Sequence, residues 1–239
     1  AAAAAVAAHL DTDALRDLAR IGRAAPKTEA TPAIPPLGRK IAVARDAAFS
    51  FVYPHILDGW RRAGAEVTFF SPLNGDGPPT DADAVYLPGG YPELHAGRIA
   101  TAERFLVGLR TAADAGTSVF GECGGYMVLG AGLTDADGVR HAMAGLLPVE
   151  TSFAERKLHL GYRRAMLLAD GPLGPAGTAI RGHEFHYATI LSEELDPGRD
   201  APLFQAANAR GDDLGALGSV RGSVMGSFVH LIDQEDSGA

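Results

Sequence analysis

Short apolar runs alternate with helical patterns between residues 41 and 120, and this alternation limits the folds open to the chain. The apolar runs have the length of buried strands and lie at 41–44, 66–70, 84–87 and 118–120. The helical patterns lie at 54–63 and 99–113. Strands that alternate with helices form a parallel sheet covered on both faces. We therefore predict an α/β fold with an open, mostly parallel sheet flanked by helices.

The second half of the chain has a different pattern, in which β-prone segments are separated by many glycine and proline residues. These segments lie at 163–168, 178–190, 203–206 and 224–229. We expect them to form extra strands that complete or flank the sheet.

The N-terminal residues form a separate region. Residues 11–22 have the pattern of a short helix with acidic capping residues before it and a glycine behind it, and residues 23–38 are proline-rich without apolar periodicity. One helix cannot bury its apolar stripe alone. We therefore expect residues 1–38 to be the tail helix of an upstream domain plus a linker, and residues 39–239 to be one domain.

Composition narrows the class of protein. The chain has 239 residues, a net charge of −8 and one cysteine, which excludes an internal disulfide framework and a cysteine-rich zinc site. Its cations are scattered, so the sequence shows no footprint for nucleic acid. No apolar run approaches the roughly 20 residues that span a bilayer, and residues 1–8 lack the basic start of a signal peptide. We expect a cytoplasmic protein with small-molecule ligands.

The single cysteine lies on a predicted strand-to-helix turn. Gly121, Cys123 and Gly125 follow the run at 118–120 and precede a helical pattern, as in a nucleophile elbow. Glycine relieves the steric conflict of such a turn, and a helix N-terminus favours the thiolate over the thiol. The alternative is a small buried apolar residue. We predict that Cys123 is a catalytic nucleophile.

A second glycine pair follows the neighbouring strand. Gly89 and Gly90 come directly after the run at 84–87, and the carboxyl ends of parallel strands are where ligands bind in such sheets. A Pro-Gly-Gly sequence is otherwise an ordinary turn. Beside an elbow, its bare amides with that of Gly124 predict an oxyanion hole.

A thiol nucleophile needs a base, and His230 is the best candidate. It follows the strand-like run at 226–229, whose end we expect at the active edge of the sheet. A structural histidine at a strand end is the alternative. We expect no metal at His183 and His186, because residues three apart on a strand face opposite sides. Glu184 and His186 share a face and are predicted to line a pocket.

Five ordered motifs carry a family resemblance. They are FSFVYP at 49–54, GAEVTFFSPL at 64–73, LPGGYPEL at 87–94, GECGG at 121–125 and RGHEFHY at 181–187. Together they resemble the glutaminase domain of the cobyrinic and hydrogenobyrinic acid a,c-diamide synthases, a cobalamin-biosynthesis branch of the class I glutamine amidotransferases. The PGGYPE form favours this family over the related cobyric acid synthases.

The resemblance implies a flavodoxin-like amidotransferase fold and a glutaminase reaction. Cys123 would attack the side-chain amide of L-glutamine, the amides of Gly90 and Gly124 would hold the oxyanion, and His230 would protonate the departing ammonia. In such ligases the ammonia passes to an upstream synthetase domain, where MgATP activates the a and c carboxylates of the corrin. Whether that corrin carries cobalt stays open.

Two features depart from the family pattern. The chain contains no G-x-x-x-x-G-K-[ST] phosphate loop, so we expect no cofactor here and MgATP in the synthetase domain. Conventional triads carry a glutamate two residues after the histidine, whereas this chain has Ile232 there and Asp233 next. Asp233 can orient His230 only if the strand turns. Glu184, or a carboxylate of the upstream domain, is the other option for the orienting acid.

Two further functions stay open from the sequence. The same elbow could serve a stand-alone cysteine hydrolase, or the domain could be a non-catalytic, amidotransferase-like binding module. The intact elbow, glycine pairs and histidine favour catalysis. The oligomeric state also stays open, with a homodimer among the alternatives.

Overall fold

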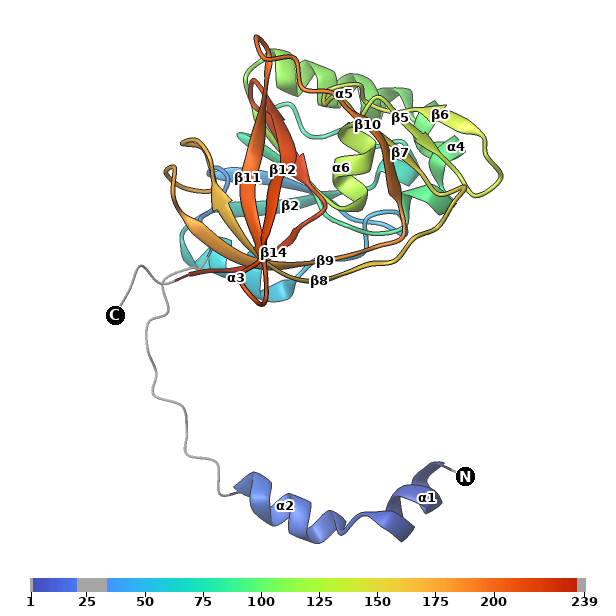
Figure 1. The fold of residues 1–239 in the computed structure, drawn as a ribbon, viewed down its shortest axis with the longest axis vertical. Helices are drawn as coiled ribbons and strands as arrows, with labels where there is room; N and C mark the ends of the chain where they lie inside the picture. The colour runs from blue at the N-terminus through green and yellow to red at the C-terminus, as the bar shows by residue number, and fades with distance from the viewer. Residues whose placement is uncertain (1, 21–33, 236–239) are drawn as a thin grey trace. The chain divides into compact units, whose positions relative to one another are not determined.

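The computed structural model describes residues 2–20 and 34–235 (Figure 1). The chain divides into two compact units, 1–30 and 31–239. The first contains α1 (Ala2–His9), which the sequence analysis did not predict, and α2 (Thr12–Arg20). The Asp11 carboxylate caps α2, because it accepts hydrogen bonds from the amides of Asp13 at 3.1 Å and Ala14 at 2.9 Å. Gly22 and the linker residues 23–33 lie outside the described residues.

A ten-stranded sheet dominates the described part of the second unit, and one half of it is parallel. This half has the strand order β2 (Glu66–Phe70), β1 (Lys40–Ala44), β3 (Ala84–Leu87), β4 (Ser118–Glu122) and β13 (Val224–Ser227). The order matches the flavodoxin-like arrangement that the resemblance implies. The predicted α/β class with a parallel sheet is confirmed.

Helices cover both faces of the parallel half (Figure 1). On one face lie α4 (Ala96–Thr101), α5 (Glu103–Asp114) and α6 (Gly124–Leu129), and on the other lies α3 (Pro54–Arg62). Successive strand residues alternate between the two cores: Val85 packs with the α5 face and Tyr86 with the α3 face. Two short 3₁₀ helices, η1 (Pro72–Asn74) and η2 (Pro92–Leu94), complete this half.

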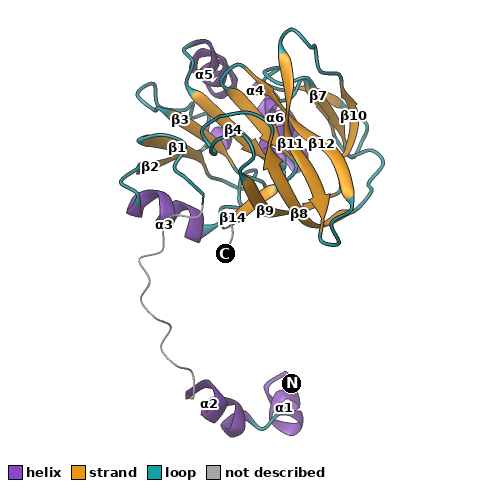
Figure 2. Ribbon diagram, turned by 60° about the vertical axis from the view of Figure 1, so that its left-hand side comes forward, coloured by secondary structure: helices purple, strands orange, loops and turns teal. Residues whose placement is uncertain are grey.

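The other half of the sheet is antiparallel and consists of the extra strands expected in the C-terminal part. Beyond β13 the order is β12 (Asp213–Arg221), β11 (Asp200–Asn208), β8 (His159–Leu167), β9 (Ala179–His186) and β14 (His230–Gln234), and Figure 2 shows the long strands side by side. A separate four-stranded sheet has the order β10 (Thr189–Glu193), β7 (Val149–Ser152), β5 (Gly132–Thr134) and β6 (Arg140–Ala142). The whole large sheet is therefore mixed.

Several boundaries differ from the predicted ones. The helix expected at 99–113 is two helices, since Ala102 leaves the helical conformation, and the strand at 178–190 is divided between β9 and β10. Strands β5, β6, β7, β12 and β14 were not predicted. Ile34 and Leu37, assigned above to the linker, are buried in the core beside α3, so the packed domain begins before residue 39. In the described residues no helix combines the length and apolar character needed to cross a membrane.

Candidate active site

Cys123 occupies a strained turn between β4 and α6. It has φ 47° and ψ −106°, a conformation that is unfavourable for any residue with a side chain. The flanking glycines allow the close packing of this turn: a Cβ on Gly125 would lie 1.9 Å from the carbonyl oxygen of Leu87, and one on Gly121 would lie 2.7 Å from Leu129. The Cys123 amide donates to the Ser227 carbonyl at 2.8 Å. Packing against β3 and a hydrogen bond to β13 thus fix the position of the turn.

The two glycine motifs meet beside the cysteine. A Cβ built on Gly124 would lie 3.1 Å from the amide nitrogen of Gly90, which brings the two predicted oxyanion donors to one place. Gly90 itself packs against the backbone of Ala48, where a Cβ would lie 2.1 Å from the carbonyl oxygen. The Tyr91 amide donates to that oxygen at 3.0 Å. Only glycine fits at position 90.

His230 is buried and held by packing. It begins β14, rather than ending the preceding strand as the sequence suggested, and is 1% exposed. Its ring stacks on His183 with centroids 4.9 Å apart, and His183 Nε2 is hydrogen-bonded to the Tyr53 hydroxyl at 2.7 Å. A Cβ on Gly89 would lie 2.4 Å from His230 Cε1. Gly89 and Gly90 therefore lie against both His230 and the start of α6, the helix that follows Cys123.

Burial keeps both the Cys123 thiol and the His230 imidazole neutral at rest. It raises the pKa of Cys123 to about 12; the Gly124 amide opposes this, and the carboxylates of Glu93, Glu122 and Glu184 add to it. Burial, with the nearby histidines His183 and His186, lowers the pKa of His230 to about 3. The thiolate expected from the helix N-terminus is therefore not the resting state, because desolvation outweighs the amide.

Glu122, which the sequence analysis did not select, is a buried carboxylate next to the nucleophile. It is 1% exposed; its Oε2 accepts from the Tyr86 hydroxyl at 2.7 Å and its Oε1 from the Leu231 amide at 3.0 Å. Burial raises its pKa to about 7, against the effect of these two hydrogen bonds. A carboxylate two residues after an apolar strand run, and directly before the cysteine, was the signal in the sequence that could have identified it.

Neither acid that the sequence suggested for orienting His230, Asp233 or Glu184, is hydrogen-bonded to Nδ1 of its ring. Asp233 is exposed and lies in register with Arg181 across a β-bulge, so its side chain faces solvent. Glu184 forms a nearly buried ion pair with Arg163, whose Nε donates to it at 2.9 Å. Among the described residues, Nδ1 of His230 has no hydrogen-bond partner.

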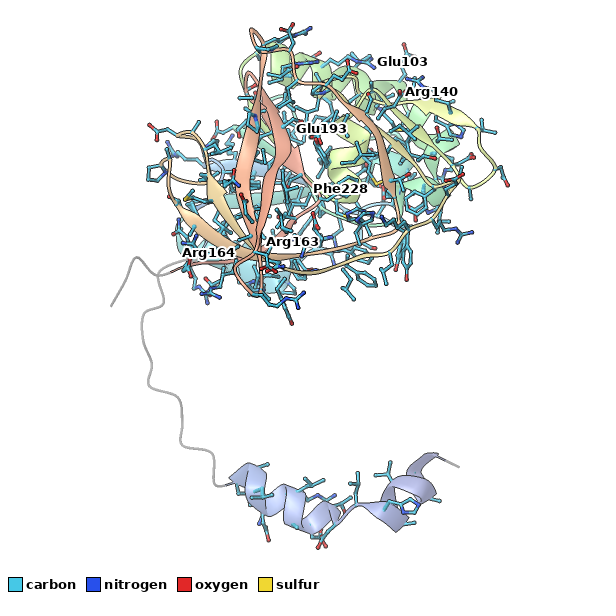
Figure 3. The ribbon with its side chains drawn as sticks, in the orientation of Figure 1. Glu103, Arg140, Arg163, Arg164, Glu193 and Phe228 are labelled. Carbon is cyan, nitrogen blue, oxygen red and sulfur yellow. The ribbon has the colours of Figure 1, made fainter. Side chains whose placement is uncertain are left out.

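Glu184 and His186 line one cavity of about 470 Å³. His186 donates from Nδ1 to the Ala188 carbonyl at 3.0 Å, because a carbonyl oxygen can only accept, and its ring stacks on Phe228. Burial lowers its pKa to about 4. Arg163, Glu193 and Phe228, labelled in Figure 3, also line the cavity. In the described part of the chain, no cluster of three or more His, Cys, Asp or Glu side chains is arranged to hold a metal ion.

Known proteins resemble this chain in sequence and in fold. Residues 40–237 match the family model of the CobB/CobQ-like glutamine amidotransferase domain. The hydrogenobyrinate a,c-diamide synthase of Sinorhizobium sp is 54% identical over 237 residues, covering 98% of this chain and 52% of that protein. The enzyme of the same description from Rhodobacter capsulatus is 59% identical over 227 residues, covering 95% and 50%. The chain thus spans about half the length of the curated relatives it matches.

Solved structures agree on the fold. PurLQS from Thermotoga maritima has a TM-score of 0.54 at 18% identity, covering 82% of this chain and 88% of that chain. A glutamine amidotransferase of the same organism has a TM-score of 0.51 at 14% identity, covering 80% and 75%. With the match over residues 40–237, the chain belongs to the CobB/CobQ-like glutamine amidotransferase domain family, which confirms the resemblance seen in the five motifs.

Proposed function

We propose that this chain is the glutaminase half of an ATP-dependent ligase that amidates the a and c carboxylates of hydrogenobyrinic or cobyrinic acid in cobalamin biosynthesis. The observation that carries the proposal is the strained Cys123 turn, with the amides of Gly90 and Gly124 beside it. The relatives described as hydrogenobyrinate a,c-diamide synthases support the choice of ligase. The compartment we propose is the cytoplasm.

The reaction begins from a neutral thiol and a neutral imidazole. His230 takes the thiol proton as Cys123 Sγ attacks the side-chain amide carbon of glutamine, and the amides of Gly90 and Gly124 stabilise the oxyanion. His230 then gives the proton to the departing amine, which leaves as ammonia with a thioester behind. Water hydrolyses the thioester to glutamate and restores the thiol. The sum is glutamine plus water to glutamate plus ammonia.

The cavity beside the elbow suits the α-groups of the amino acid. Arg163 offers a planar guanidinium for the α-carboxylate, and Glu184 offers a carboxylate for the α-ammonium group. The charge of Glu184 adds to the rise in the pKa of Cys123, and Tyr126 of α6, the helix after the cysteine, lines the same cavity as Glu184. We infer that glutamine binds with its side-chain amide towards Cys123 and its α-groups in this cavity.

The ATP-dependent steps belong to the rest of the proposed ligase. The chain carries no phosphate-loop motif, and it spans about half of its curated relatives. We propose that MgATP and the corrin bind to a separate synthetase domain, which consumes the ammonia made at Cys123.

Replacement of the nucleophile tests the proposal. In the full-length ligase, Cys123→Ala should lower glutamate release from glutamine by at least about 1,000-fold, because no thioester can form. Amidation of the corrin with ammonium chloride in place of glutamine should stay at the wild-type rate. Unchanged glutamate release in Cys123→Ala would refute the proposal, and loss of ammonia-dependent amidation would show that the variant is misfolded.

A further inference from the structure

The strands that carry Cys123 and His230 are far apart in the order of the sheet. Cys123 follows β4 and His230 begins β14, and strands β9, β8, β11, β12 and β13 lie between them in the hydrogen-bonded order. A shorter connection also exists, because the Cys123 amide donates to the Ser227 carbonyl at the end of β13, and two residues, Phe228 and Val229, join β13 to His230. A side-chain hydrogen bond directly from β4 to β14 would add a second constraint on the position of His230 relative to Cys123.

The side chain of Glu122 makes such a tie. It extends from the last residue of β4 to the amide of Leu231, the residue after His230, and this 3.0 Å hydrogen bond is buried. The other carboxylate oxygen is held at 2.7 Å by the Tyr86 hydroxyl from β3. Tyr86 is fixed in turn between Trp60, packed edge-on at 5.5 Å, and Phe120, stacked at 5.8 Å. The carboxylate is thus immobilised on one side and bonded to the histidine strand on the other.

The imidazole itself is oriented without an acid among the described residues. Its Nδ1 is buried without a hydrogen-bond partner, and the ring is confined by His183 and by the backbone of Gly89. Packing of this kind is sensitive to small shifts of the backbone that carries the ring. A conventional triad acid holds the ring directly by a hydrogen bond. Here the ring depends instead on the position of the backbone that carries it.

We propose that Glu122 is the positioning residue of the Cys123–His230 pair, acting through the backbone of β14 rather than on the imidazole. The inference rests on the proposed glutaminase function. The Glu122 carboxylate accepts a hydrogen bond from the Leu231 amide and so fixes the distance between the nucleophile strand β4 and the histidine strand β14. Because a misplacement of about 1 Å can cost about 100-fold in rate, this one acceptor controls turnover without contacting the substrate.

Two variants of matched size separate positioning from packing. Glu122→Gln keeps a carbonyl oxygen for the Leu231 amide, and its NH2 group can donate to the Tyr86 oxygen. Glu122→Met has a similar length and no comparable acceptor. Both are made in the full-length ligase, and kcat and KM for glutamate release are measured beside ammonia-dependent amidation of the corrin.

The positioning role predicts a loss confined to kcat. Glu122→Met should lower kcat for glutamate release about 100-fold, with KM for glutamine changed less than about threefold. Glu122→Gln should stay within about tenfold of wild type, and ammonia-dependent amidation should be equal in all three proteins. Equal kcat in the two variants would overturn the inference, as would a parallel loss of ammonia-dependent amidation in Glu122→Met. A wild-type ligase that releases no glutamate would instead refute the proposed function.

Discussion

The parallel and antiparallel halves of the large sheet differ in how deeply they are buried. Every residue of β3 and β13 is buried, whereas β8 alternates between half-buried and exposed positions over most of its length. The difference follows from the helices, which cover both faces of the parallel half. The nucleophile follows a strand of the buried half, and the histidine begins the outermost strand of the other.

The contrast extends to apolar side chains at the surface. On β8 of the antiparallel half, Leu160 is 63% exposed and Tyr162 is 74% exposed, and Phe185 lies opposite Leu160 on β9. The site therefore joins a tightly packed scaffold to a more open one. Substitutions in the first should damage the fold, and substitutions at the junction should damage the chemistry.

The largest expected effect is the loss of stability caused by a substitution in the parallel half. Gly125→Ala places a Cβ 1.9 Å from the carbonyl oxygen of Leu87, and no flexible side chain can move aside. We expect a loss of more than about 4 kcal/mol in the free energy of unfolding. Urea denaturation followed by circular dichroism measures it. A wild-type midpoint would show that α6 can shift away from β3.

At the junction of the halves, a similar change should affect turnover more than stability. Gly89→Ala directs a Cβ at His230 Cε1, 2.4 Å away, and should displace the ring, lowering kcat for glutamate release about 100-fold. Gly97→Ala is the matched control, because its Cβ would meet another histidine, His141, at an ordinary 3.6 Å. The control should retain full activity. Equal activity in the two variants would contradict the packing account of His230.

The two halves should also respond to acid with opposite signs. In the parallel half burial raises the pKa of Glu122 from 4.5 to about 7, and in the antiparallel half it lowers the pKa of His230 from 6.5 to about 3. Between pH 4.5 and 6.5, Glu122 binds its proton in the folded protein but not in the unfolded protein, so a lower pH stabilises the fold through Glu122. In the same range His230 binds a proton only in the unfolded protein, so a lower pH destabilises the fold through His230. Each contributes about 1.4 kcal/mol per pH unit.

These opposing contributions should nearly cancel between pH 4.5 and 6.5 in the wild type. Glu122→Gln removes the carboxyl, so its free energy of unfolding should fall about 1.4 kcal/mol more per pH unit than that of the wild type as the pH decreases through this range. Denaturation curves at several pH values measure the slope. Parallel curves for the two proteins would show that Glu122 ionises normally.

The smallest expected effect compares one hydroxyl from each half. Tyr86→Phe removes the buried hydrogen bond to Glu122 and should lower the free energy of unfolding by about 1 kcal/mol. Tyr162→Phe, at an exposed position of β8, should change it by less than about 0.5 kcal/mol. Thermal unfolding of the two variants separates them. Equal midpoints would mean that the Tyr86 hydroxyl adds nothing to stability.

The sequence predicted the parallel half better than the antiparallel half, for a physical reason. Strands covered on both faces are continuous apolar runs, so β1, β3 and β4 were evident, as was the elbow after them. Strand β12 has two glycines among nine residues and mostly half-exposed positions, so its sequence lacks a strand pattern. His230 was selected as a candidate, but its place at the start of β14 depends on the break after Ser227, which local propensity does not encode.

The role of Glu122 could not be derived from local sequence. Its partners are Tyr86, 36 residues before it, and Leu231, 109 residues after it. Asp233 was one candidate for the orienting acid because it is near His230 in sequence, yet it is exposed and lies beside a β-bulge. Contacts between distant strands determine which carboxylate becomes buried, and these contacts exist only in the folded chain.

The backbone at Cys123 has a consequence for how this family evolves. With φ at 47° and ψ at −106°, a side-chain-bearing residue costs about 1–3 kcal/mol that glycine largely avoids. Selection for folding alone therefore favours Cys123→Gly, and only selection for turnover opposes it. A descendant that no longer hydrolysed glutamine would gain stability by losing its thiol, so a cysteine retained at this turn records continuing use of the reaction.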